Sequence, residues 1–154
     1  VDNPVAYTLI VANTFRSHGS HVVREFIGQL GWLDTSLPKL LVIFYLMVLV
    51  FVSLVDVQKG VRLYCADKCV IGGVVMLSVI GILTSLYLFW TPIGWKVILG
   101  IQGRYFIAVS PLLFLLLYNE KTGVHIKMLN VMIAGFSSCV LTYTLMVLAK
   151  RYYL

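Results

Sequence analysis

The sequence predicts an all-α protein: a polytopic transmembrane helical bundle of about four spanning helices, preceded by an interfacial amphipathic helix. Of its 154 residues, 60% are hydrophobic and only 12% are charged, and the mean hydropathy is +0.96. A soluble domain of this size cannot bury so large an apolar fraction in its core. Four apolar segments also stand out along the chain. We therefore expect a multi-pass protein of the cell membrane, with membrane lipid as a partner.

Residues 1–36 are expected to form a membrane-interface segment. Around residues 20–30 the apolar side chains share one helical face, and polar or charged side chains occupy much of the other. The apolar face consists of Val22, Val23, Phe26, Ile27 and Leu30. Such an amphipathic helix is typical of a segment that lies on the membrane surface. Glu25, beside Arg24, is interpreted as a solvated charge.

The first residues, Val-Asp-Asn-Pro, include no initiating Met and lack the features of a signal peptide. We therefore expect a part of a longer protein. Residues 4–15 are interpreted as the end of a preceding span. No internal repeat or low-complexity tract divides the chain.

Residues 37–154 are expected to form the four-helix transmembrane region. A spanning helix needs roughly 20 apolar residues to cross about 30 Å of hydrocarbon. The predicted spans lie near residues 37–55, 70–90, 97–118 and 128–149. At the start of the first span, Thr35 or Ser36 is expected to cap the helix, with Pro38 in its first turn.

The third segment is the exception, because its own apolar run covers only residues 105–118, about 21 Å of helix. One interpretation extends a continuous helix back to Val97, which places Gln102 and Arg104 within the membrane boundary. The alternative starts the helix at Arg104 and thins the bilayer locally. In either case Pro111 is expected to kink the helix in mid-span.

The net charge of +6 indicates topology signals and lipid head groups. The basic residues are scattered between the apolar segments, which argues against nucleic-acid binding. They fall on both predicted sides of the membrane, so the positive-inside rule gives no orientation. The three cysteines form neither a disulfide framework nor a metal motif. No metal or cofactor is expected, and the sequence specifies no oligomeric state.

Gln102 and Arg104 are the most informative polar residues. A guanidinium near free helix N–H groups favours a phosphate group. Gly100 and Gly103 permit a ligand to approach the backbone closely. The alternative is an arginine that extends to the lipid head groups, with the glycines serving helix packing. Composition alone favours this second interpretation over a site for a phosphate-bearing lipid.

Two motifs resemble a known family. "GIQGRYFIAVSPLLFLLL", preceded by "FWTPIGW", and "FIGQLGWLDTSLP" at 26–38 are similar to the C-terminal half of the bacterial membrane-protein family called domain of unknown function 2142. One departure is Ala108, near which the family often has proline. The family is related by fold to GT-C type glycosyltransferases that use polyprenyl-phosphate sugars. The resemblance implies cell-surface glycan assembly, with a sugar donor and a glycan acceptor bound on the extracytoplasmic side.

The motif positions define the candidate substrate-binding residues that the resemblance implies. They are Gln102, Arg104, Tyr105, Trp32, Asp34 and Lys96. The residues of the first motif are candidates for donor-phosphate or sugar contacts, and Lys96 either assists them or is a solvated loop lysine. Trp32 either stacks on a sugar ring or anchors the chain at the interface. Asp34 either orients an acceptor hydroxyl or Arg104, or caps a helix.

The resemblance leaves the enzymatic role open. In related glycosyltransferases the catalytic carboxylate lies in the first large extracytoplasmic loop, near the N-terminus. Because this chain resembles the C-terminal half, it is expected to lack that carboxylate, and its catalytic residues are unknown. One alternative is a non-catalytic module for export, flipping or scaffolding that binds lipid phosphate. A transporter fragment is a further alternative, weakened because the mid-spans hold few ionisable groups.

Overall fold

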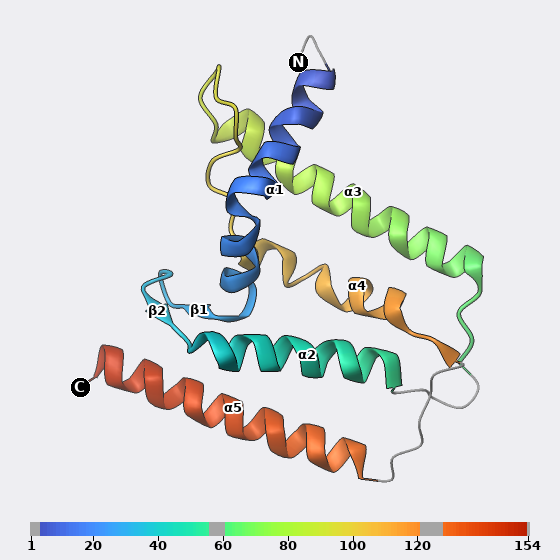
Figure 1. Ribbon diagram of the computed structural model, residues 1–154, viewed down its shortest axis with the longest axis vertical. Coiled ribbons are helices and arrows are strands. Elements are labelled where there is room, and N and C mark those ends of the chain that lie inside the picture. Colours follow the sequence, from blue (N-terminus) through green and yellow to red (C-terminus); the bar gives the residue numbers. More distant parts are fainter. Residues whose placement is uncertain (1–3, 56–60, 121–127, 154) are drawn as a thin grey trace. The chain divides into compact units, whose positions relative to one another are not determined.

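The computed structural model describes residues 4–55, 61–120 and 128–153 and is mostly helical (Figure 1). Its elements are α1 (Pro4–Ile27), β1 (Gln29–Leu30), β2 (Thr35–Ser36), α2 (Lys39–Val55), α3 (Cys65–Phe89), the 3-10 helix η1 (Gly103–Phe106), α4 (Ser110–Leu117) and α5 (Leu129–Tyr152). The chain divides into two compact units, and each is described by itself. The first contains residues 1–27 and 64–116, and the second contains residues 28–63 and 117–154.

In the first unit, α1 is one uninterrupted helix. The stretch 4–15, interpreted from the sequence as the end of a separate span, continues directly into the amphipathic stretch. The N-terminal part of α1 packs on the C-terminal part of α3. The hydroxyl groups of Tyr7 and Thr84 are 2.8 Å apart, and the rings of Tyr7 and Tyr87 meet edge to face at 5.5 Å. These contacts fix where α1 crosses α3.

The predicted second segment is confirmed as α3, which starts five residues earlier than expected, at Cys65. The cause is local. The Asp67 carboxylate accepts a hydrogen bond of 2.9 Å from the backbone N–H of Tyr64, so the first turn forms around polar residues that hydropathy alone excludes. The helix continues to Phe89, and at 25 residues it is long enough to cross a bilayer.

The third segment differs from the prediction, and the continuous helix from Val97 is wrong. Residues 97–102 form no helix, residues 103–106 form η1, and α4 does not begin until Ser110. Gly100 has a φ of +74°, a left-handed conformation that a continuing α-helix excludes. The mid-span kink is also wrong, because Pro111 is the second residue of α4, where its missing N–H has no partner to lose.

The C-terminal end of α4 is fixed to the beginning of α3. The Lys68 ammonium group donates a hydrogen bond of 3.3 Å to the carbonyl oxygen of Leu116. Carbonyl groups in the last turn of a helix have no intrahelical donor, and the helix dipole makes that end attractive to a cation. The short helix α4 is therefore held at its C-terminal end by a charged side chain.

The second unit begins with a small antiparallel hairpin that the sequence did not reveal. Strand β1 pairs with β2 in the register Gln29 opposite Ser36 and Leu30 opposite Thr35. The predicted cap at Thr35 or Ser36 is therefore wrong, because both residues belong to a strand and α2 begins at Lys39. The backbone N–H of Leu37 bonds the Gly28 carbonyl oxygen at 2.7 Å and closes the hairpin.

The first and fourth apolar segments are helical, as predicted, and form α2 and α5. Their contact is aromatic. The ring of Phe136 on α5 lies 5.3 Å from that of Phe44, edge to face, and 5.8 Å from that of Tyr45. Such pairs favour these offset arrangements over face-to-face stacking.

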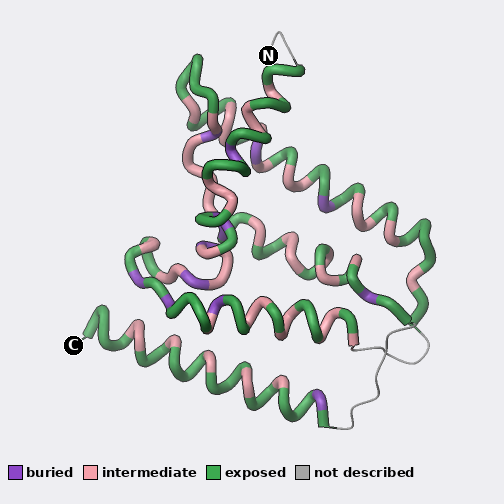
Figure 2. The backbone as a smooth tube through the Cα atoms, in the orientation of Figure 1, coloured by how far each residue is buried: buried purple, intermediate pink, exposed green. Residues whose placement is uncertain are grey.

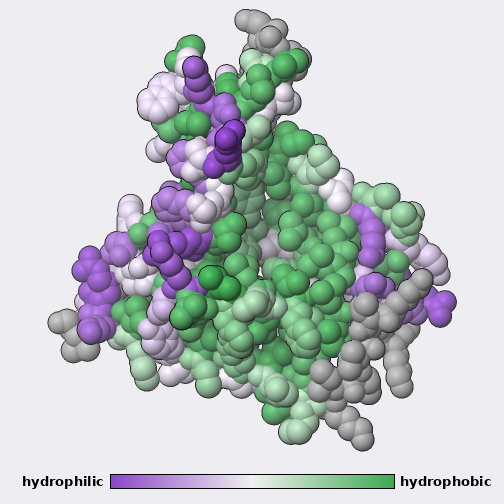
Figure 3. Space-filling view, in the orientation of Figure 1, coloured by the Kyte–Doolittle hydropathy of each residue, from purple (hydrophilic) through white to green (hydrophobic). Residues whose placement is uncertain are grey.

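Within the described parts of the chain, two helices are long and apolar enough to cross a membrane, namely α3 and α5. In its most apolar 18-residue stretch α3 buries only 11% of the residues, and α5 buries none (Figure 2). Figure 3 shows hydrophobic side chains exposed over the helices and hydrophilic ones mainly at helix ends and along α1. In a soluble protein such helices would form the core. Their exposure fits a lipid environment. Helix α2, with 17 residues, is shorter than both.

Candidate functional site

The candidate site lies on the segment from Ile98 to Arg104, which runs beside α1 (Figure 1). Two buried side chains of α1 hold this segment. The Thr14 hydroxyl accepts a hydrogen bond of 2.8 Å from the backbone N–H of Ile98, and Glu25 accepts one of 2.9 Å from that of Gly103. Both donors lie in loop or 3-10 backbone, so without these acceptors they would be buried and unsatisfied.

Helix geometry gives the spacing of the two attachment points, Thr14 and Glu25. Thr14 and Glu25 are about three turns apart, so they lie on the same face of α1, separated by about 16 Å along the axis. Five residues of fully extended chain, from Ile98 to Gly103, reach at most about 18 Å. The segment therefore follows α1 for about three turns between its two attachment points.

Gly103 approaches the backbone of α1 more closely than any other residue type could. A Cβ atom at this position would overlap the carbonyl oxygen of Val22 and the backbone nitrogen of Phe26, and would lie 2.8 Å from the carbonyl carbon of Glu25. These are backbone atoms of a helix and cannot rotate away. The absence of a side chain at Gly103 is what allows η1 to lie against α1.

The preceding loop is held by the residues that follow α3. Gly100 packs on Trp90, where an added Cβ would lie 2.7 Å from the indole Nε1. The Thr91 hydroxyl donates to the carbonyl oxygen of Leu86 and accepts from the backbone N–H of Leu99, each at 3.1 Å. Close packing on Trp90 therefore accounts for Gly100, and close packing on α1 accounts for Gly103.

Arg104 is exposed at the end of this fixed segment. Its Nε donates a hydrogen bond of 2.7 Å to the side-chain oxygen of Gln102, which orients the guanidinium group. Among the described residues, Gln102 is the hydrogen-bond partner of the Arg104 side chain. Tyr105 follows on η1 and is 39% exposed, and Lys96 is exposed in the loop before it. Gln102 and Arg104 are thus brought into contact, beside an accessible aromatic residue.

Glu25 corrects the sequence interpretation, which took it for a solvated charge. Its side chain is only 7% exposed, and its second carboxylate oxygen lies 3.3 Å from Nδ1 of His21, one turn earlier on α1. Glu25 and Thr14 hold the motif segment in place, and the sequence analysis did not identify either residue in this role. No sequence signal marks them, because their partners are backbone N–H groups 78 and 84 positions away.

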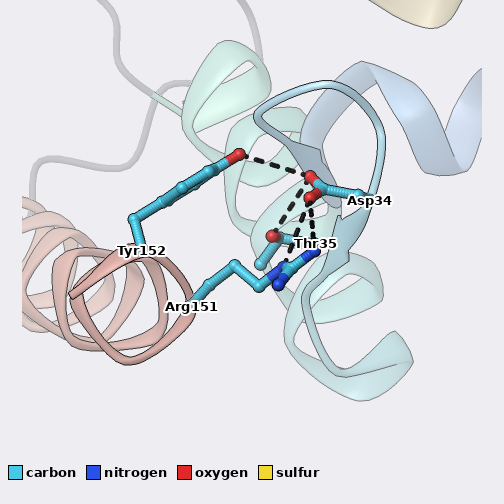
Figure 4. A network of polar contacts seen from close by, with 4 residues as sticks. All are labelled: Asp34, Thr35, Arg151 and Tyr152. Carbon is cyan, nitrogen blue, oxygen red and sulfur yellow. Dashed lines mark hydrogen bonds and ion pairs between the residues drawn. The ribbon is translucent and has the colours of Figure 1, made fainter. Parts of the chain in front are cut away.

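Asp34 lies in the second unit and contacts the last turns of α5 (Figure 4). Its carboxylate lies 3.2 Å from the Arg151 guanidinium and accepts hydrogen bonds from the hydroxyl groups of Tyr152 and Thr35. Partial desolvation raises the pKa of Asp34. Hydrogen bonding to its own backbone N–H, the charge of Arg151 and the bond from Thr35 outweigh that effect, so the pKa lies below its ordinary value of 3.8.

Trp32 occupies the tip of the hairpin loop and is 92% exposed. It lies between two residues with left-handed backbone, Gly31 at φ +63° and Leu33 at φ +67°. A left-handed leucine is uncommon and needs support from its surroundings. The six candidate residues are thus divided between the units, with Trp32 and Asp34 in the second and the other four in the first.

These observations define a class of protein: a helical membrane protein with an exposed, oriented arginine on a loop fastened to its N-terminal helix. The chain belongs to the family described as predicted membrane protein (DUF2142), which matches residues 1–113. This confirms the family inferred from the two motifs. Comparison with curated proteins and with solved structures finds no match. The family match ends within α4, so the Asp34 partners on α5 lie outside it.

Proposed function

We propose that this chain is the C-terminal part of a membrane glycosyltransferase-like protein that binds polyprenyl-phosphate-linked sugar during cell-surface glycan assembly. The observation that carries the proposal is the Arg104 guanidinium, oriented at Nε by Gln102 and otherwise accessible. An arginine held in one orientation presents its remaining N–H groups as a planar fork, which matches phosphate oxygens. Tyr105 and Lys96 are the neighbouring candidates for sugar and phosphate contacts.

A second guanidinium on α1 supports an anionic ligand in this unit. Nε of Arg24 is buried and has no hydrogen-bond partner among the described residues. Buried donors normally find an acceptor. Arg24 directly precedes Glu25, the residue that fixes Gly103. A phosphate bound near this end of α1 would supply an acceptor oxygen to the Arg24 guanidinium group.

Within the described residues, every carboxylate already has a structural partner. Glu25 binds Gly103 and His21, Asp34 binds Arg151, Asp67 caps α3, and Glu120 lies 3.2 Å from Arg62. This favours a contribution to binding and not to proton transfer. It also supports the second candidate function, a non-catalytic module that binds lipid phosphate for export, flipping or scaffolding.

The membrane topology is part of the proposal. We propose that α2 and the third segment also cross the membrane, which gives four spans with α3 and α5. In the third segment, η1 and α4 together with the turn between them provide the length that α4 alone lacks. A locally thinned bilayer would accommodate the remaining mismatch. Arg104 would then lie at the extracytoplasmic end of that segment.

The test is the affinity of the full-length protein for polyprenyl phosphate, measured in lipid nanodiscs. Arg104→Gln removes the guanidinium, and we expect the dissociation constant to rise about 10- to 100-fold, the value of one charge-assisted contact. Arg104→Lys keeps the charge without the fork, so we expect an intermediate loss. Arg16→Gln is the matched control, because Arg16 is an exposed arginine on α1.

If both Arg104 variants bind polyprenyl phosphate as tightly as the parent and the Arg16 variant do, the phosphate site is refuted. Arg104 would then be an arginine whose side chain extends to the lipid head groups. Sugar transfer from a polyprenyl-phosphate sugar by the full-length protein distinguishes the two candidate functions. Transfer that falls with Arg104→Gln supports the enzyme. Binding that depends on Arg104 without transfer supports the module.

A further inference from the structure

The exposed hairpin tip and the end of α5 form one surface, which is independent of the proposed phosphate site. Strand β2 packs against α5, and Asp34 in the loop joins the hairpin to Arg151 and Tyr152. Figure 4 shows the Arg151 and Tyr152 side chains extending from the helix toward the Asp34 carboxylate. The position of Trp32 is thereby tied to the last turns of a helix that is long enough to span a bilayer.

The chemistry of this surface is aromatic and cationic. Trp32 is 92% exposed and Tyr153 is 89% exposed. Lys150 and Arg151 occupy the last turn of α5, and Lys39 follows the hairpin at the start of α2. Among the described residues of this surface Asp34 is the acidic one, and it is engaged by Arg151. The surface therefore has an excess of positive charge beside two amphipathic rings.

We propose that the hairpin tip and the C-terminal end of α5 form an interfacial anchor that binds the head-group layer of an anionic phospholipid membrane. Tryptophan and tyrosine concentrate at membrane interfaces, and lysine or arginine at the end of a span extends to lipid phosphates. Arg151 and Lys150 mark the depth at which α5 leaves the hydrocarbon. Because Asp34 holds the loop at that level, Trp32 lies at the head groups of the same leaflet.

The inference commits to lipid for two reasons. The positive excess is complementary to an anionic lipid surface, where each basic residue adds to the attraction. The surface also lies at the end of α5, whose most apolar 18-residue stretch contains no buried residue and is expected to contact acyl chains. The same bilayer can therefore contact both α5, through its acyl chains, and the hairpin tip, through its head groups.

The experiment measures the depth of Trp32 in vesicles of phosphatidylcholine and phosphatidylglycerol. In the full chain, Trp90→Phe and Trp95→Phe leave Trp32 as the remaining tryptophan. We expect lipids brominated close to the glycerol to quench its emission about twofold more than lipids brominated near the chain end, because interfacial tryptophan lies at the head-group level. Since Trp90 packs on Gly100, the same quenching is also obtained as the difference between the wild-type chain and Trp32→Phe.

Asp34→Asn tests whether the ion pair positions the tip. We expect quenching by the shallow bromines to fall and quenching by aqueous iodide to rise. Glu120→Gln is the matched control, since it removes the same charge from a carboxylate paired with another arginine, Arg62, and should change neither value. Strong iodide quenching without lipid quenching in the parent would overturn the proposal. So would emission that neither quencher reaches, which would indicate a protein partner or a second copy of the chain.

Discussion

Replacing Gly103 with alanine tests the closest contact in the first unit. The added Cβ would overlap the backbone of α1 at Val22 and Phe26 and would lie 2.8 Å from the carbonyl carbon of Glu25. Because helix backbone cannot yield locally, η1 has to move away from α1. That movement lengthens the hydrogen bond from the Gly103 N–H to Glu25, now 2.9 Å.

Two costs determine the expected magnitude. Forcing a methyl group into a close contact typically costs about 1–3 kcal/mol. A weakened hydrogen bond to a charged acceptor adds a part of the roughly 1.5–3 kcal/mol that such bonds contribute. The reduced freedom of the unfolded chain offsets these by about 0.4–1 kcal/mol. We therefore expect Gly103→Ala to destabilise the first unit by about 2–4 kcal/mol.

The matched control is Gly19→Ala. Gly19 is inside α1, and a Cβ there would have no atom within 4 Å. Alanine is preferred over glycine in a helix by about 0.8–1 kcal/mol, so this variant should be more stable than the parent. The two variants carry the same chemical change and are expected to shift stability in opposite directions.

The assay is thermal unfolding of the full chain in detergent, followed by circular dichroism, together with hydrogen exchange of the Gly103 region. We expect a lower midpoint and faster exchange near residue 103 for Gly103→Ala. A midpoint equal to or above that of Gly19→Ala, with unchanged exchange, would show that η1 does not lie against α1 as described.

Two further predictions concern Thr14, the other attachment point of the loop, and Asp34 in the second unit. Thr14→Val leaves the buried N–H of Ile98 without an acceptor and should cost about 1–3 kcal/mol in thermal unfolding, whereas Thr8→Val, whose exposed hydroxyl bonds its own helix, should be nearly neutral. If both variants unfold alike, Thr14 does not hold the loop. Because the folded-state pKa of Asp34 lies below 3.8, its contact with Arg151 should be complete above that pH and lost as the pH falls through the lower folded-state value. Trp32 emission should report this loss in the parent and stay constant with pH in Asp34→Asn, and a pH-dependent signal in both would contradict the assignment.

The positions of the apolar helices were predictable because hydropathy detects long runs of apolar side chains. The fourth segment was predicted at 128–149 and α5 occupies Leu129–Tyr152, while the first segment was predicted at 37–55 and α2 occupies Lys39–Val55. The errors are at the ends, where polar residues join the helix. Lys150 and Arg151 extend α5 beyond its apolar part, and pairing with Gln29 and Leu30 draws residues 35 and 36 into a strand.

The third segment failed for a different reason. Hydropathy cannot distinguish an apolar residue in a helix from one in an irregular loop held by hydrogen bonds. Residues 97–102 form no helix, and side chains of α1 and Thr91 accept the hydrogen bonds of the Ile98, Leu99 and Gly103 backbone N–H groups. The glycines were recognised as positions of close approach, but the sequence gives no sign that the approaching group is α1 and not a ligand.

The site residues were predicted unevenly. Gln102 and Arg104 were selected as a pair and are joined at 2.7 Å. The partners of Asp34 were not foreseen, since Arg151 and Tyr152 lie more than a hundred positions away and one of two suggested roles was helix capping. Contacts between side chains that are close in the sequence can be inferred from a motif, whereas pairs joined by the tertiary fold cannot.

The fastening of residues 98–103 to α1 has a consequence for how the protein can change. With one end at Thr14 and the other at Glu25, deleting a single residue would shorten the reach of the chain by up to about 3.6 Å, which is more than a hydrogen bond tolerates. Between the attachment points, Gly100 is constrained as well, by its left-handed backbone and its close contact with Trp90. The loop that displays Arg104 is therefore constrained both in its minimum length and at its two glycines.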